Sequence, residues 1–402
     1  MGLKDLLQQK KIMDTDGTAY LSLKEERRIA QKNAKTMRTF ERRKNRKNVS
    51  EAEYLTQMED AGNVVEFSDV HTYFFTDIGT VKAVNGVSFA IPQGKTVGIV
   101  GESGCGKSVT SLSLMQLVQA PQGQVVSGEI RYTSSEGKCY NIVNMPRDKM
   151  LHIRGREISM IFQEPMTSLN PVFTIGDQMD EVVLLHEENM TAASAKARSL
   201  KMLDMVGIAM PDKIHASYPH ELSGGMRQRV MIAMALSCSP RLVIADEPTT
   251  ALDVTIQAQI LSLLKDIKHK INGSIMLITH DLGVIAEMAD YVVVMYAGRI
   301  VEKGTAEDVF YRPKHPYTAG LMRSKPSMSN KLERLYSIPG QVPSPINMPN
   351  HCYFANRCEH CMERCFEQYP PLMQFSDTHF ASCYLYGNST EPITLPLNVE
   401  KE

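Results

Sequence analysis

Residues 101–108 read Gly101-Glu102-Ser103-Gly104-Cys105-Gly106-Lys107-Ser108 and match the phosphate-loop pattern G-x-x-x-x-G-K-[ST] at every fixed position. The apolar run 96–100 before it predicts a buried strand, and residues 109–115 after it predict the start of a helix. In this context backbone N–H groups and a helix N-terminus can surround a phosphate. The stretch therefore predicts a nucleotide site in an α/β fold.

Individual side chains of this loop have expected roles. Lys107 would reach the β- and γ-phosphates, and the Ser108 hydroxyl would hold Mg²⁺. Cys105 lies between two glycines, near Lys107 and a helix N-terminus, and such surroundings lower the pKa of a thiol. We therefore expect alkylation of Cys105 to block ATP binding, and ATP to protect it. The alternative is a small residue that is tolerated where the backbone makes the contacts.

Composition is that of an ordinary globular chain. Of its 402 residues, 43% are hydrophobic and 22% are charged, and the formal net charge of −1 does not favour nucleic acid as a partner. The N-terminus lacks the apolar segment of a signal peptide, and no stretch has the roughly 18 apolar residues of a transmembrane helix. If the protein works at a membrane, we expect other chains to hold it there.

The chain divides into three parts that differ in composition and in hydrophobic pattern. Residues 1–60 form a basic arm, with eleven Lys or Arg against three Glu between Lys24 and Lys47. This arm is either a solvated, partly helical appendage, a surface for anionic lipid or an acidic partner, or a nucleic-acid contact, although interleaved aromatics are absent apart from Phe40. Residues 61–312 alternate short apolar strands with helices, which predicts a parallel α/β core with an antiparallel strand group and a helical subdomain at about 166–235. Residues 313–402 are Pro-rich and then Cys-rich.

Four further stretches carry chemistry. The apolar strand 242–246 ends in Asp246, which can hold Mg²⁺ through water, and Glu247 can polarise a water for attack on the γ-phosphate. Gln163 and His280 also follow predicted strands. The turn 222–225, Leu-Ser-Gly-Gly, precedes a helix and can present a hydroxyl and backbone N–H groups to a phosphate.

Together these stretches resemble the ATPase subunits of ABC transporters over about residues 64–325. The resemblance identifies Walker A at 101–108, the Q-loop at Gln163, the signature at 222–225, Walker B at 242–247, the D-loop at Ala251-Leu252-Asp253 and the switch histidine at His280. It implies a P-loop ABC-type nucleotide-binding domain with an antiparallel β subdomain, a helical subdomain and a Cys-rich C-terminal extension.

The resemblance also implies the site residues. Catalysis is expected from Glu247, His280 and Gln163, and Mg²⁺ binding from Ser108, Gln163 and Asp246. In the family ATP lies between two subunits, so the signature would act on the partner's nucleotide. The ATP contacts implied are Phe74 on adenine (Phe75 as the alternative), Gly101, Ser103, Gly104, Cys105, Gly106, Lys107, Ser108 and Val109, with Ser223, Gly224, Gly225 and Asp253 facing the partner.

A narrower resemblance comes from residues 163–171, 223–236 and His315-Pro316-Tyr317-Thr318, which are similar to the D-type ATP-binding subunit of oligopeptide/dipeptide permeases. It implies a peptide importer at the cytoplasmic face of the cell membrane. The implied partners are an F-type ATPase subunit, two transmembrane permease subunits and an extracytoplasmic peptide-binding protein, with no nucleic acid. Import of nickel or another small solute, a soluble ABC ATPase outside transport, and a regulatory module without turnover are the alternatives.

Five of the eight cysteines crowd into residues 352–383. Disulfides are not expected beside a cytosolic ATPase, which leaves an iron–sulfur cluster, Zn²⁺ or free thiols. The permease subunits carry C-x5-C-x6-C and a distant Cys, and some hold a [4Fe-4S] cluster. Cys352, Cys358, Cys365 and Cys383 match that pattern and leave Cys361 over, although the Cys358-x2-Cys361 pair would suit Zn²⁺. We expect a structural role, because the hydrolytic motifs are complete without it.

Overall fold

A computed structural model describes residues 22–163, 168–187, 189–249, 253–271, 273–324 and 336–387. Its main sheet has the strand order β11-β12-β10-β9-β3-β8-β7-β6. The parallel strands are β6 (Ile158–Ile161), β7 (Leu242–Asp246), β8 (Ser274–Ile278), β3 (Thr96–Val100) and β9 (Tyr291–Tyr296). The sheet continues antiparallel through β10 (Arg299–Thr305), β12 (Phe380–Ala381) and β11 (Met373–Gln374). This confirms the predicted parallel α/β core.

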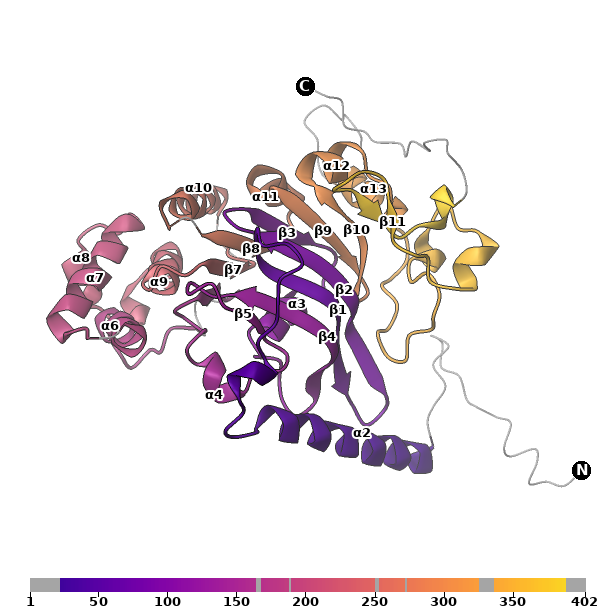
Figure 1. The fold of residues 1–402 in the computed structure, drawn as a ribbon. Helices are drawn as coiled ribbons and strands as arrows, with labels where there is room; N and C mark the ends of the chain where they lie inside the picture. The colour runs from indigo at the N-terminus through magenta and orange to yellow at the C-terminus, as the bar shows by residue number, and fades with distance from the viewer. Residues whose placement is uncertain are drawn as a thin grey trace, which may run out of the picture.

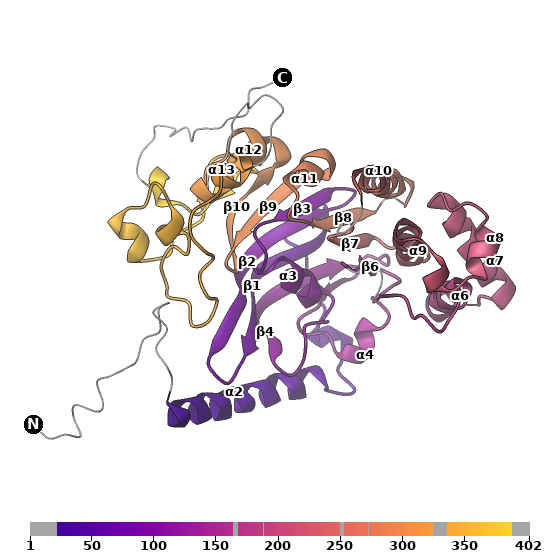
Figure 2. The same cartoon turned by 180° about the vertical axis from the view of Figure 1, so that it is seen from behind.

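A second, antiparallel sheet lies across the core, as Figures 1 and 2 show. Its order is β2-β1-β4-β5, with β1 (Asn63–Phe75), β2 (Thr80–Pro92), β4 (Gly123–Thr133) and β5 (Cys139–Asn141). Strand β1 runs unbroken through the polar residues Ser68 and Asp69, because a bulge absorbs them. Asp69 has a φ of 46°, and the pairing register with β2 shifts between Phe67 and Val70.

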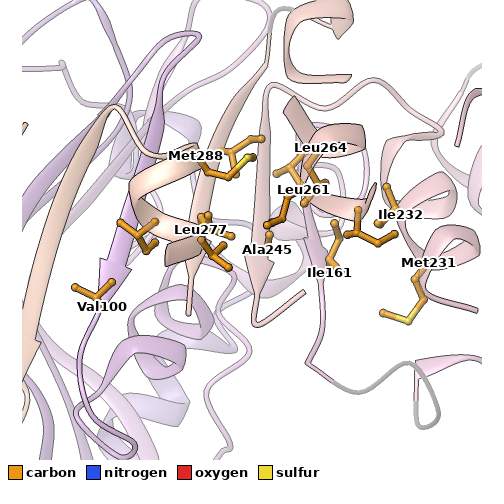
Figure 3. Close-up of a cluster of buried hydrophobic side chains, with 14 of the residues drawn as sticks. Val100, Ile161, Met231, Ile232, Ala245, Leu261, Leu264, Leu277 and Met288 are labelled. Atoms are coloured by element: carbon orange, nitrogen blue, oxygen red, sulfur yellow. The ribbon is translucent and has the colours of Figure 1, made fainter. Parts of the chain in front are cut away.

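The core lies on both faces of the main sheet because successive strand residues point in opposite directions. Along β8, Ile275 and Leu277 pack in one cluster, whereas Met276 and Ile278 pack in the other. Figure 3 shows the first cluster, where Ala245 and Leu277 of the sheet meet side chains of three covering helices. These helices are α9 (Gly224–Leu236), α10 (Val254–Ile271) and α11 (Leu282–Met288). The parallel strands are thus buried on both sides.

The expected helical region stands to one side of the sheet (Figure 1). It comprises α6 (Ile175–His186), α7 (Ala192–Met205), α8 (Pro211–His215) and α9. A capping box starts α6, where Thr174 and Asp177 bond reciprocally to each other's backbone N–H groups. Other α-helices among the described residues are α3 (Lys107–Leu114), α4 (Arg147–Met150), α12 (Ala306–Tyr311) and α13 (Pro316–Arg323).

Part of the basic arm is a docked helix, α2 (Leu23–Lys44), which runs along the antiparallel sheet (Figure 1). Its one buried residue, Asn33, donates its side-chain amide to the carbonyl oxygens of Thr76 and Gly79, at 2.8 and 3.3 Å. Gln124 of β4 donates to Glu41 at 2.7 Å. The basic side chains mostly face solvent, whereas Ile29, Met37 and Phe40 recur at helical spacing and are half-buried, so polar contacts and a short apolar face together hold this helix in place.

The C-terminal region joins the main sheet through the pairing of β12 with β10. The buried carboxylate of Glu302 on β10 accepts hydrogen bonds from the backbone N–H groups of Lys314 and His315, at 2.6 and 2.9 Å, and lies 2.8 Å from Nε2 of His379. This region is therefore packed on the α/β core. Among the described helices, none has the length and apolar content needed to cross a membrane.

Candidate functional site

Four of the predicted motifs meet at one edge of the main sheet. The phosphate loop follows β3, His280 follows β8, Glu247 follows β7 and Gln163 follows β6. These four strands are parallel neighbours, so their carboxyl ends lie side by side. Ligands of open α/β sheets bind at such carboxyl ends. The sheet order therefore brings together residues that are up to 179 positions apart in the sequence.

Glycines let the phosphate loop fold tightly against its neighbours. A Cβ atom on Gly106 would lie 2.2 Å from the carbonyl oxygen of Ala83, and one on Gly101 would lie 2.2 Å from that of Met295. Helix α3 starts directly after Gly106, so Ser108 and Val109 lie in its first turn. Ser103 and Gly104 are exposed at the crest of the loop. The loop can thus present backbone N–H groups and a helix N-terminus to an anion.

Lys107 and Ser108 contact the surrounding polar groups directly. The Lys107 ammonium donates to the carbonyl oxygens of Gly101 and Glu102, at 2.8 and 3.1 Å. The Ser108 hydroxyl donates to Oδ1 of Asp246 at 3.0 Å. Burial raises the pKa of the Asp246 carboxyl to about 6, against the opposing effects of Ser108 and Lys107. A hydroxyl beside a buried carboxylate is a donor set that suits Mg²⁺, whose charge would favour the ionised carboxylate.

Glu247 links the two polar residues that flank it. Oε2 accepts from the side-chain amide of Gln163 at 2.9 Å, and Oε1 lies 3.1 Å from Nδ1 of His280. Glu247 itself has a φ of 48°, in the left-handed region, and its N–H donates to the carbonyl of Ile278 at 2.8 Å. Strained backbone of this kind is concentrated at functional sites. The turn aims the carboxylate along the sheet edge between Gln163 and His280.

The signature turn lies at the start of α9. The Ser223 hydroxyl caps this helix by accepting from the N–H of Met226 at 3.3 Å. Ser223 and Gly224 are exposed, and a Cβ atom on Gly224 would enter open space. Gln228 has no role that a local sequence pattern predicts, yet its buried amide donates to the carbonyl of Pro248 at 2.6 Å. This bond ties the signature helix to the segment that follows Glu247.

The side chain of Cys105 lies in the core beneath the phosphate loop. The expectation of a reactive Cys105 is wrong, because its side chain is 1% exposed and burial raises the pKa of its thiol. The thiol is folded into the core, and desolvation outweighs the nearby Lys107.

In the D-loop, Ala251 and Leu252 lie outside the described residues. Asp253 accepts from the N–H of Ile256 at 3.0 Å and starts α10.

Four cysteines line one pocket beside α13, and they are the four of the predicted set: Cys352, Cys358, Cys365 and Cys383. Cys361 is not among its lining residues. Burial raises the pKa of the Cys352 thiol to about 12 and that of Cys358 to about 11. Within the described ranges, no group of three or more His, Cys, Asp or Glu side chains is arranged to hold a metal ion. The donor chemistry thus suits a thiolate-bound group, whereas the side-chain positions are those of free thiols.

The phosphate loop also has contacts that sequence reasoning missed. Glu102, the second residue of the loop, is bonded to Arg357 and Tyr317 of the C-terminal region. Arg357 immediately precedes Cys358, and Tyr317 lies within residues 315–318, which resemble the peptide permease subunits. No local pattern links either residue to a loop more than 200 positions earlier.

Comparisons with known proteins agree with these motifs. The family model described as "ABC transporter" matches residues 84–250, and the model described as "Oligopeptide/dipeptide transporter, C-terminal region" matches residues 301–365. The chain is 50% identical over 323 residues to the oligopeptide transport ATP-binding protein AppD of Bacillus subtilis, which spans 80% of this chain and 97% of that protein. It is 48% identical over 332 residues to the dipeptide transport ATP-binding protein DppD of the same organism, spanning 83% and 97%.

A solved structure has the same fold. The ATP-binding cassette MJ0796, seen as a dimer in a post-hydrolysis state bound to ADP and Pi, superposes with a TM-score of 0.53 at 25% identity. The match covers 60% of this chain and 98% of the cassette.

The raised pKa of Asp246 predicts a pH dependence of stability. Between its ordinary value of 3.8 and about 6, the folded carboxyl keeps a proton that the unfolded one has lost. The free energy of unfolding of the nucleotide-free, Mg²⁺-free protein should therefore fall as pH rises through this window, by up to roughly 3 kcal/mol. Urea unfolding of the full chain at a series of pH values measures this. In Asp246→Asn the free energy of unfolding should no longer fall with pH in this window, whereas in Asp204→Asn, at an exposed position on α7, it should fall as in the wild type. Equal slopes for the wild type and Asp246→Asn would contradict the assignment.

Proposed function

Because the chain belongs to the ATP-binding proteins of oligopeptide and dipeptide ABC transporters, we propose that it binds and hydrolyses ATP to power the import of peptides. The proposal rests above all on sequence identity: this chain is 50% and 48% identical to an oligopeptide and a dipeptide transport protein, over 97% of the length of each. The meeting of the phosphate loop, Asp246, Glu247 and His280 at one sheet edge supports the same conclusion from the chemistry.

The proposed roles follow from position. The N–H groups of Gly101, Ser103, Gly104, Cys105 and Gly106, with the first turn of α3 from Lys107 to Val109, surround the phosphates. Ser108, Asp246 and Gln163 would hold Mg²⁺, which neutralises charge on the β- and γ-phosphates. Phe74 is half-buried whereas Phe75 is buried, which favours Phe74 as the contact for adenine.

Glu247 is the proposed general base. Its carboxylate is 15% exposed and is held from two sides, so it can accept a proton from a water placed in line with the γ-phosphate. His280 is 65% exposed and can turn from Glu247 toward the γ-phosphate. Gln163 contacts Glu247, so nucleotide binding and hydrolysis can be coupled through residues 163–178 to the membrane subunits. Both residues would then act only when a nucleotide is present.

The signature is proposed to act on a second subunit's nucleotide. Ser223 and Gly224 face solvent, as residues that complete a partner's site must. Asp253 would lie in the same interface. The MJ0796 cassette is described as a dimer, which supports a paired arrangement. For this chain we propose an F-type ATPase subunit as the partner, in a heterodimer.

The assembly proposed around this pair is an importer. Two transmembrane permease subunits would hold the ATPases at the cytoplasmic face of the membrane, and an extracytoplasmic protein would deliver the peptide. Selectivity then lies in other chains, so nickel or another small solute is the competing substrate. The exposed basic side chains of α2 are suited to anionic lipid, a role that leaves the ATP site unaffected.

The cysteine pocket is proposed to bind a [4Fe-4S] cluster with a structural role. The support is that the four cysteines of the predicted spacing, and not Cys361, line one pocket. Thiolates are the usual ligands of such clusters. Binding requires the four side chains to rearrange, since as they stand they do not form a metal site among the described residues. Zn²⁺ is the competing ligand.

Substituting Glu247 with Gln tests the catalytic assignment. The amide cannot accept the proton, so ATP hydrolysis by the assembled transporter should fall at least about 100-fold while ATP binding persists. Glu287→Gln, the same change at an exposed position of α11, should leave hydrolysis unchanged. An unchanged rate in Glu247→Gln would show that another group is the base, or that the complex does not hydrolyse ATP at this site.

Matched cysteine variants test the cluster. Full-length protein purified anaerobically should be coloured and contain about four iron atoms per chain. Cys365→Ser should lose the iron and the visible absorbance, whereas Cys361→Ser should retain both. A colourless, iron-free wild-type protein from anaerobic cells would refute the cluster, and stoichiometric zinc in it would favour Zn²⁺.

A further inference from the structure

The phosphate loop is held from outside the ATPase core by a fork-to-fork ion pair. Nη1 and Nη2 of Arg357 donate to the two carboxylate oxygens of Glu102, at 2.7 and 2.9 Å. The Arg357 side chain is only 6% exposed and that of Glu102 is 26% exposed. Paired parallel hydrogen bonds of this kind fix orientation as well as distance. Glu102 therefore points away from the expected phosphate position and into the C-terminal region.

The rest of the Arg357 guanidinium is also bonded. Nε donates to the carbonyl of Pro339 at 2.8 Å, and Nη1 also reaches the hydroxyl of Tyr296 at 3.2 Å. Removing Arg357 would therefore free Glu102 and leave several acceptors without their donor. The side chain has no freedom to follow the loop if the loop moves.

A second contact holds the backbone at the same point. The N–H of Glu102 donates to the hydroxyl of Tyr317, at 2.9 Å. Tyr317 is fully buried in α13, and its ring packs on those of Tyr296 and Phe354 with centroid distances of 4.7 and 5.4 Å. Both the side chain and the backbone of Glu102 are thus fixed by residues of the matched C-terminal region, 301–365.

Glu102, which these contacts hold in place, is itself hydrogen-bonded to Lys107. The carbonyl of Glu102 is one of the two backbone carbonyls that accept from the Lys107 ammonium. Ordering a free loop residue costs conformational entropy, and a loop ordered in advance avoids that cost when its ligand binds. Contacts to Glu102 should therefore appear in the affinity for nucleotide rather than in the chemical step.

We propose that Arg357 and Tyr317 are positioning residues through which the C-terminal region presets the phosphate loop for ATP. The inference rests on the proposed ATP site. It gives the C-terminal region a role in nucleotide binding in addition to its packing on the core. Arg357 immediately precedes Cys358, so one short helix, Ala355–Arg357, connects the cysteine pocket to the phosphate loop.

Nucleotide affinity of the folded full chain tests the proposal. Titration with a fluorescent MgATP analogue should show binding about tenfold weaker in Arg357→Gln and several-fold weaker in Tyr317→Phe, which removes one hydroxyl and keeps the packing. Arg364→Gln, the same change at an exposed position of the C-terminal region, should bind like the wild type. In the assembled transporter, the KM for ATP should rise while kcat changes less than twofold. A merely structural role would instead lower the amount of active protein at unchanged KM.

A double-mutant cycle sharpens the test. If Arg357 acts through Glu102, the double variant Arg357→Gln/Glu102→Gln should bind the MgATP analogue no more weakly than either single variant. The expected loss of affinity is about tenfold, whereas independent effects would multiply to about a hundredfold. Wild-type affinity in folded Arg357→Gln and Tyr317→Phe, or multiplicative losses in the double variant, would overturn the inference. A wild type that fails to bind MgATP would instead refute the proposed function itself.

Discussion

Parallel strand pairing is the constraint on which the site depends. Parallel neighbours place their carboxyl ends along one edge, and β3, β8, β7 and β6 are consecutive in the sheet. The loops that follow them carry Lys107, His280, Glu247 and Gln163. Because both faces of these strands are buried, the strand ends are fixed, and side chains from four distant stretches meet with hydrogen-bonding geometry.

Much of this arrangement could be predicted from the sequence because each motif is local. The strand 242–246 and its terminal Asp246 are read directly from an apolar run that ends in a carboxylate. That Ser108 and Asp246 lie at the same edge then follows from the general rule for parallel sheets, and the structure adds the hydrogen bond between them. Residues 64–74 were harder, because Asp69 within a bulge resembles a turn between two strands.

Other features are set by tertiary packing and leave no local signal. The surroundings of Cys105 in the sequence favour a low thiol pKa, but the fold buries the thiol and raises it. Arg357 and Glu102 are 255 positions apart, and no spacing rule connects them. Docking of α2 likewise depends on Asn33 meeting two carbonyl groups of a distant turn, which an arm rich in Lys and Arg does not reveal.

The central claim is that this chain is an ATPase subunit whose hydrolysis of ATP powers peptide import. The most direct measurement is uptake of a labelled oligopeptide by the transporter reconstituted in vesicles with its membrane partners and binding protein, with ATP hydrolysis recorded in parallel. The account predicts ATP-dependent peptide uptake and faster hydrolysis when the binding protein carries peptide. Hydrolysis that is indifferent to peptide, or uptake of nickel in place of peptide, would contradict it.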